Sequence, residues 1–263
     1  MDTVASAPLR RLQTGLLAVE VHPDRAALGQ AAARSVAAAL REILRTQAGA
    51  RVIFACAPSQ DEFLAALTAP PLAGQVDWAR VTAFHMDDYV GLAGDHPQSF
   101  RRYLRTHLLE RVPVGRFHPL QAESPNPTAE CARYAALLAA APIDLICLGI
   151  GENGHLAFND PPVADFDDPA LVKVVELDEA CRRQQVNDGC FPSLESVPRH
   201  ALTLTLPVFR AARRLSVQVP GPRKAAAVRA TVHDPISTAC PATLLRTHPQ
   251  AILFLDQASA GLL

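Results

Sequence analysis

Short apolar runs alternate with longer stretches of helical periodicity along nearly the whole chain. Such runs are typical of buried strands, and here they occupy residues 16–21, 51–56, 81–86, 143–149, 214–219 and 251–255. The spacing of apolar residues between the runs predicts helices over residues 24–45, 61–67, 99–109, 128–141 and 222–230. Two further segments, 171–177 and 201–206, alternate apolar and polar residues in the manner of half-buried strands.

This order of strands and helices predicts an α/β fold, with a doubly wound, mostly parallel sheet and helices on both of its faces. The chain shows no internal repeat and no low-complexity linker, so we expect residues 1–263 to form a single domain. In such sheets, ligands bind beyond the carboxyl ends of the strands. The polar segments 84–92 and 149–161, which follow two of the apolar runs, are therefore the first candidates for a functional site.

Composition narrows the class of protein. The 263 residues are 49% hydrophobic and 19% charged, and a net charge of -1 gives no electrostatic reason to expect nucleic acid or an anionic membrane as a partner. No apolar stretch reaches the roughly 20 residues of a membrane span, and residues 1–13 lack the apolar core of a signal peptide. The six cysteines form no CxxC pair, which favours buried free thiols and a cytoplasmic location.

The first polar segment places two adjacent carboxylates, Asp87 and Asp88, at the end of the run 81–86. A carboxylate in a dry site has a raised pKa and can act as a general base toward a C–H or O–H proton. The simpler interpretation is an aspartate that forms a turn or pairs with an arginine, because Asp is common in turns. This segment alone does not decide between the two.

The second polar segment carries a histidine between glycines. His155 can exchange protons at neutral pH, and Asn153 and Asp160 are close enough in sequence to orient it. Glycines permit positive φ angles and a close approach of the backbone to a ligand; they stand here at Gly149, Gly151 and Gly154. An ordinary Asn-Gly turn with an incidental histidine is the alternative interpretation.

Other kinds of site find less support in the sequence. The three glycines also spell GxGxxG, but Pro161 and Pro162 interrupt the helix that a dinucleotide site requires. The nine histidines are scattered without the close spacing of metal ligands, so we expect no metal. The GxSxG motif of serine hydrolases does not occur.

Several longer motifs follow one another in a fixed order. Two are specific: Met-Asp-Asp-Tyr at 86–89 and Gly-His-Leu-Ala-Phe-Asn-Asp at 154–160. Further matches are His-Pro-Gln-Ser-Phe at 96–100, Pro-Gly-Pro-Arg-Lys-Ala at 220–225 and Ile-Ser-Thr-Ala-Cys at 236–240. From about residue 52 to residue 255, the chain thus resembles the glucosamine-6-phosphate deaminase/isomerase family.

The resemblance implies an aldose–ketose isomerisation of an amino-sugar phosphate that needs no metal and no cofactor, releases ammonia and gives fructose 6-phosphate. It implies that Asp87 is the general base, which moves the C2 proton to C1, and that His155 opens the pyranose ring. Asn153 and Asp160 match groups that orient this histidine. Substrate contacts are expected from Ser59, Asp88, Gly151, Gly154, Arg182 and Lys224, the last of which matches a phosphate-binding lysine.

Three positions depart from the family pattern. Asp160 stands where glutamate is common, which shortens the side chain by one methylene. In the loop 56–60, Pro58 removes a backbone N–H that would otherwise donate to phosphate. Asn187 falls at the position of a phosphate-binding arginine. Phosphate recognition is therefore less firmly implied than the isomerase chemistry.

Three alternatives stay open on the sequence. The chain could be a sugar-lactone hydrolase that resembles 6-phosphogluconolactonase, which has a related Gly-x-x-Gly-His loop. It could be a sensor that binds a sugar phosphate without turnover. It could act on a different amino sugar or an unphosphorylated analogue. In each case the partner is a small sugar-type molecule, and a homo-oligomer is neither implied nor excluded.

Overall fold

The main element of the fold is an eight-stranded sheet. The computed structural model describes residues 7–263. The prediction that residues 1–13 hold no signal peptide falls partly on residues 1–6, which lie outside the described residues. Across the sheet the strands are β1 (Arg10–Thr14), β2 (Leu17–His22), β11 (Ala251–Asp256), β10 (Leu215–Val219), β7 (Leu145–Leu148), β3 (Ala50–Phe54), β4 (Val81–His85) and β6 (Arg116–His118). β1 pairs with β2 in the antiparallel direction, and the remaining neighbours are parallel.

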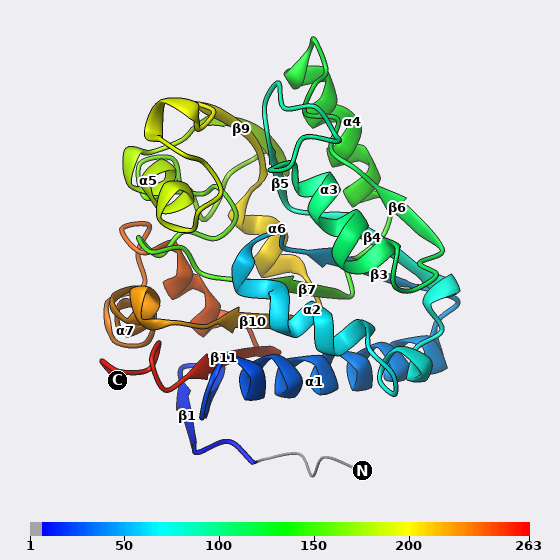
Figure 1. The fold of residues 1–263 in the computed structure, drawn as a ribbon, viewed down its shortest axis with the longest axis vertical. Coiled ribbons are helices and arrows are strands. Elements are labelled where there is room, and N and C mark those ends of the chain that lie inside the picture. Colours follow the sequence, from blue (N-terminus) through cyan, green and yellow to red (C-terminus); the bar gives the residue numbers. More distant parts are fainter. Residues whose placement is uncertain (1–6) are drawn as a thin grey trace.

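Helices cover both faces of this sheet because its strands are apolar on both sides. Ile53 packs into one hydrophobic cluster, whereas its neighbours Val52 and Phe54 pack into another. The cluster around Phe54 also takes in side chains of α1 (Arg25–Thr46), α2 (Asp61–Thr68) and α3 (Phe100–Leu104). The cluster around Ile53 includes side chains of α4 (Pro127–Ala139), α6 (Leu206–Ala211) and α7 (Ala225–His233). The long helix α1 runs along the sheet in Figure 1.

The sequence determines the start of α1 through a local hydrogen bond. Asp24 adopts an extended conformation, and its carboxylate accepts from the backbone N–H of Ala27 at 2.8 Å. Such an N-cap satisfies one of the amide donors that the first turn of a helix leaves free. The predicted helix over 24–45 is therefore confirmed nearly to the residue.

A second, three-stranded antiparallel sheet lies beyond the main one, with strand order β5 (Asp87–Tyr89), β9 (His200–Leu204) and β8 (Val172–Glu176). The strands predicted at 171–177 and 201–206 exist, but they join this separate sheet. The helix α5 (Glu179–Asn187) packs with it over a third, smaller apolar cluster. In Figure 1, α5, β5 and β9 lie on the upper side of the view. Leu202 and Leu204 of β9 also belong to a core cluster of the main sheet, so the two sheets share apolar packing.

The α/β class with a mostly parallel sheet is thus confirmed, and the differences are local. The helix predicted over 99–109 is divided into α3 and a π-helical segment, Arg105–Leu109. The elements β1, β5, β6, α5 and α6 were not predicted. All six cysteines are free, and five of them are buried. Among the helices of residues 7–263, none combines the length and apolarity that crossing a membrane requires.

Candidate active site

A pocket opens where four neighbouring parallel strands end. β10, β7, β3 and β4 are adjacent in the main sheet, so their carboxyl ends lie at one edge. The segment that follows each of them contributes side chains to a pocket with about 130 Å³ of free space. Gln184 and Gln185 of helix α5, and Asp188 directly after it, form another part of the wall. The edge of the sheet at which a ligand site was predicted therefore holds a pocket.

Asp87 reaches this pocket with a carboxyl group that no described residue engages in a hydrogen bond. Asp87 lies in β5, where its backbone pairs with Thr203 of β9, and its side chain lines the pocket and is only 6% exposed. Burial raises the pKa of the Asp87 carboxyl well above its ordinary value, and the neighbouring charge of Asp88 raises it further. A buried carboxylate with few stabilising contacts accepts a proton more readily, as a general base must.

Asp88 does not line the pocket, although it was expected to bind substrate. It is fully buried, and its carboxylate accepts hydrogen bonds from the backbone N–H groups of Tyr89 and Phe100, from the Ser99 hydroxyl, and from Nε of Arg101 at 2.9 Å. Successive side chains of a strand point to opposite faces. The simpler interpretation, an aspartate paired with an arginine, describes the contacts of Asp88, and its direct contact with substrate stays a prediction.

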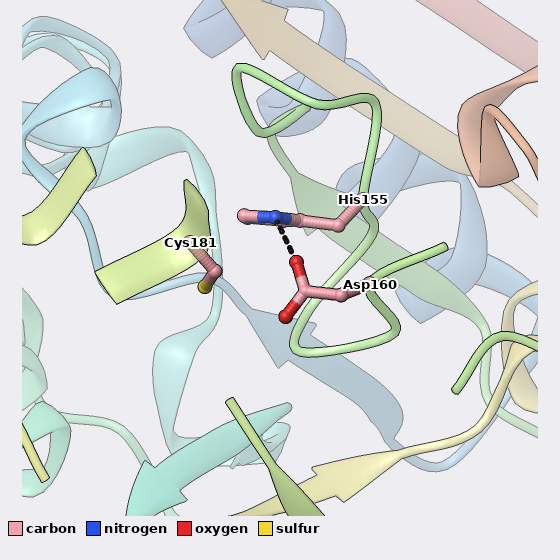
Figure 2. A group of neighbouring side chains, drawn as sticks. All are labelled: His155, Asp160 and Cys181. Carbon is pink, nitrogen blue, oxygen red and sulfur yellow. Dashed lines mark hydrogen bonds and ion pairs between the residues drawn. The ribbon is translucent and has the colours of Figure 1, made fainter. Parts of the chain in front are cut away.

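His155 lies in the loop after β7 and is held from behind by two side chains. Its Nδ1 is hydrogen-bonded to Oδ1 of Asp160 at 2.8 Å, as Figure 2 shows. Asn153 donates to the same carboxylate oxygen at 2.9 Å and accepts from the backbone N–H of His155 at 3.1 Å. Because the ring is anchored through Nδ1, its Nε2 edge is left for the pocket, which His155 lines.

The hydrogen bonds to Asp160 also determine its charge state. Burial alone would raise the pKa of the Asp160 carboxyl, but the hydrogen bonds and charge of His155, together with the hydrogen bond from Asn153, hold that pKa below its ordinary value. The carboxylate therefore stays ionised beside the imidazole. An ionised partner stabilises a protonated imidazole, so His155 is suited to carry a proton during a reaction.

Two glycines make room for the histidine loop. A Cβ atom on Gly151 would lie 2.2 Å from the His155 ring, so any other residue at this position would displace the imidazole. Gly154 has a φ of 83°, and a Cβ there would lie 2.5 Å from the sulfur of Cys240. Both positions thus need glycine for the shape of the loop. Gly151 lines the pocket, whereas Gly154 does not.

Cys181 of α5 lies beside the pair of His155 and Asp160. The three side chains offer polar atoms within 4.8 Å of one another, a spacing that a metal ion could bridge (Figure 2). However, burial and the nearby Asp160 charge raise the pKa of the Cys181 thiol well above its ordinary value. Next to the Asp160 carboxylate, Cys181 is therefore a protonated thiol in the absence of a metal.

Charges of both signs surround another part of the pocket. Lys224 and Asp188 both line it, and Lys224 is 7% exposed. Arg223 forms ion pairs with Asp188 and, at 3.0 Å, with Glu152. Burial lowers the pKa of the Lys224 ammonium, and Asp188 and Glu152 act in the opposite direction.

Most of the residues predicted for the site are found at or directly behind the pocket. Ser59, Asp87, Gly151, His155 and Lys224 line it, and Asn153 and Asp160 support His155. Arg182 is an exception, because its guanidinium group donates to the backbone carbonyls of Leu194 and Val197. Arg182 does not line the pocket, and its binding of substrate stays a prediction.

Among the residues at the pocket that were not predicted, three lie on α5 or at its C-terminal end. Cys181 stands beside Asp160, Gln184 accepts from the backbone N–H of Glu152 at 2.8 Å, and Asp188 lines the pocket. Their spacing of three and four residues places them on one face of a helix. That spacing is a signal that the sequence contained, once a helix was expected there.

Comparison with known proteins gives consistent results along the chain. The family described as "Glucosamine-6-phosphate isomerases/6-phosphogluconolactonase" matches residues 23–254. A glucosamine-6-phosphate deaminase of Exiguobacterium is 40% identical over 186 residues, which are 71% of this chain and 71% of the relative. A glucosamine-6-phosphate deaminase of Listeria innocua is 35% identical over 197 residues, 75% of this chain and 82% of the relative.

Solved structures agree with the fold. A structure described as a monomeric glucosamine-6-phosphate deaminase superposes with a TM-score of 0.85 at 29% identity, covering 93% of this chain and 99% of its own. A 6-phosphogluconolactonase from Shewanella baltica superposes with a TM-score of 0.74 at 19% identity, covering 90% of this chain and 97% of its own. At that identity the second likeness shows the shared fold alone.

Proposed function

Because this chain belongs to the family of glucosamine-6-phosphate isomerases and 6-phosphogluconolactonases, we propose that it is a glucosamine-6-phosphate deaminase. It converts glucosamine 6-phosphate to fructose 6-phosphate and ammonia. The observation that carries this proposal is the pair of acid–base groups in one pocket, the unengaged carboxyl of Asp87 and the imidazole of His155 anchored by Asp160. The amino sugar must first open, then isomerise, and then lose its nitrogen.

His155 serves the ring-opening step. The O1 hydroxyl of the closed sugar loses its proton while the ring oxygen gains one, which breaks the C1–O5 bond and leaves an aldehyde. An imidazole that faces the pocket through Nε2 can deliver the proton to the ring oxygen. The ionised Asp160 stabilises the protonated imidazole through Nδ1, at 2.8 Å. Asn153 holds both partners in this orientation.

Asp87 serves the isomerisation step. Its carboxylate removes the proton from C2, which is acidic because C1 carries the carbonyl, and the resulting enolamine is reprotonated at C1. The product is a C2 imine; water adds to C2, and ammonia leaves. A carboxylate whose pKa is raised by burial is a stronger base than an exposed one.

Ammonia release is the direct test of the proposed reaction. The purified protein is given glucosamine 6-phosphate, galactosamine 6-phosphate or 6-phosphogluconolactone, and ammonia, ketose 6-phosphate and acid are measured separately. We expect ammonia and fructose 6-phosphate in equal amounts from the first sugar. Acid release from the lactone without ammonia from either amino sugar would assign the chain to lactone hydrolysis instead.

The setting of this activity is part of the same proposal. The pocket is built by segments of one chain, so we propose that a monomer suffices for turnover. The shared packing of Leu202 and Leu204 with the main sheet supports treating the two sheets as one domain. Six free cysteines support a reducing, cytoplasmic location. A size-exclusion measurement with light scattering, combined with activity across protein concentration, tests the first of these statements.

A further inference from the structure

Helix α5 runs along the pocket from His155 toward Lys224. Cys181, Gln184 and Asp188 follow one another at about one helical turn, and seven residues of helix span about 10 Å. Cys181 lies beside the His155–Asp160 pair, whereas Asp188 is bonded to Arg223, next in the chain to Lys224. We call Gln185, Asp188 and Lys224 the far end of the pocket. With C1 and C2 at Asp87 and His155, as the proposed reaction requires, we expect the C6 end of the sugar to lie toward these residues.

The positive charges near this far end are matched by negative ones. Lys224 and Arg223 bring two cations. Asp188 and Glu152 bring two carboxylates, both in ion pairs with Arg223 and both acting on Lys224. A phosphate dianion is held well where cations are uncompensated. Here Arg223 is already paired, and Lys224 lines the pocket together with the carboxylate of Asp188.

Two helix ends add to this balance. Asn187, the last residue of α5, presents a backbone carbonyl that accepts from Arg223 at 3.2 Å. A helix C-terminus carries a partial negative charge, which disfavours an anion. The opposite kind of helix end, the start of α2, would favour one, but its first turn carries Asp61 and Glu62. Asp61 accepts a hydrogen bond at 2.6 Å from Tyr103, which lines the pocket.

We propose that Asp188 is a specificity-determining residue that weakens the preference of the far end for a phosphate dianion, so that the enzyme also deaminates unphosphorylated 2-amino-2-deoxy sugars. The 6-hydroxyl of such a sugar needs only a hydrogen-bond donor and an acceptor. Lys224 donates, and Asp188 or the amide of Gln185 accepts, from side chains that line the pocket together. This inference rests on the proposed function for its catalytic half, but its charge argument concerns binding alone.

The experiment compares a phosphorylated and an unphosphorylated sugar in the wild type and in Asp188→Asn. We expect the wild type to release ammonia from glucosamine, with kcat/KM for glucosamine 6-phosphate at most about 100-fold higher. Removing the carboxylate charge should raise that ratio about tenfold or more, because Lys224 then meets the phosphate without the opposing charge of Asp188 on the pocket wall. The exposed Asp95→Asn, which also removes one negative charge but does not line the pocket, should leave the ratio unchanged.

Binding provides the second readout, independent of turnover. Calorimetric titration with fructose 6-phosphate and with fructose should show that Asp188→Asn binds the phosphate ester about tenfold more tightly than the wild type does. Circular dichroism should show an unchanged fold. A wild type that strictly requires phosphate, or a ratio and an affinity that Asp188→Asn does not move, overturns the role of Asp188. If neither sugar releases ammonia while the affinity still shifts as expected, the proposed reaction fails and the charge argument stands.

Discussion

Asp87 and Asp160 are the same residue type, both are almost fully buried, and both lie at the edge of the sheet where the pocket opens, yet their surroundings act on them in opposite ways. Asp87 has no hydrogen-bond donor on its carboxyl among the described residues, and its pKa is raised. Asp160 accepts from His155 and Asn153, and its pKa is lowered. The protein thus has one carboxylate that takes protons readily and one that keeps its charge.

This difference shows that the role of a buried aspartate depends more on the hydrogen-bond donors around its carboxylate than on its burial. A general base must be destabilised as an anion, and that instability is a cost to the fold. A carboxylate that supports an imidazole must be stable as an anion, and its hydrogen bonds contribute to the fold. The two aspartates should therefore respond differently whenever charge is removed.

The largest expected effect comes from Asp87→Asn. The amide keeps the shape of the side chain but cannot accept the C2 proton, so we expect kcat to fall by about a thousandfold, with substrate affinity changed little. Ammonia release under saturation and calorimetric binding of fructose 6-phosphate measure the two quantities. Asp95→Asn, an exposed aspartate outside the pocket, serves as the matched control with full activity. Near-normal turnover of Asp87→Asn would remove Asp87 from the proton transfer.

The wild-type pH profile tests the same group without mutation. Because burial raises the pKa of Asp87, the carboxylate is fully formed only at a pH above the ordinary aspartate value of about 4. The rate should therefore fall as the pH drops, with a midpoint clearly above 4, and this acidic limb should be absent from the residual activity of Asp87→Asn. A limb centred at or below 4 would contradict the raised pKa.

The two aspartates also show how much of the site can be predicted from the sequence. Asp87 and His155 could be paired from the sequence because each follows an apolar run, and parallel strands end at one edge. Their motifs also matched those of a family. Asp88 could not be assigned in this way, because its partner Arg101 lies on α3, and nothing in the sequence states that this helix packs against β5.

Helix α5 illustrates what was missing at the other side of the pocket. Arg182 was considered because residues 177–182 match a family pattern, and no helix phase was assigned to this segment. The positions of Cys181, Gln184 and Asp188 toward the site were therefore overlooked. The sequence does not tell which way a charged side chain points until it is known which face of the helix packs against the rest of the protein. In the same way, the alternation at 171–177 and 201–206 predicted strands but not their partners, because a strand pattern states which face is apolar and not which strand lies beside it.

A smaller loss of activity is expected from Asp160→Asn. The amide can still accept a hydrogen bond from His155, but it no longer supplies the charge that stabilises a protonated ring, so we expect kcat to fall about tenfold to a hundredfold. The loss should be specific to ring opening: glucosamine 6-phosphate should suffer, and an open-chain analogue much less. Equal losses on both substrates would show that His155 and Asp160 act elsewhere in the reaction.

The two aspartates should affect the free energy of unfolding in opposite directions. A pKa that differs between the unfolded and folded states makes this free energy depend on pH. Asp87 has a raised folded pKa, so its contribution to stability is present below the unfolded value of about 4 and is lost as the pH rises through the folded pKa. Asp160 has a lowered folded pKa, so its contribution is present above that unfolded value and is lost as the pH falls through the folded pKa.

At pH 8, Asp87→Asn should therefore be more stable than the wild type, by about 1 kcal/mol, because it removes a buried and poorly solvated charge. Asp160→Asn should be less stable by about the same amount, because it weakens the hydrogen bonds that stabilise the charge. Urea unfolding at pH 8 and pH 4, with Asp95→Asn as reference, measures both differences, which should shrink at the lower pH. If both variants were destabilised equally at pH 8, the contrast between an unengaged base and an anchored carboxylate would not hold, and Asp87 would have partners that stabilise its charge.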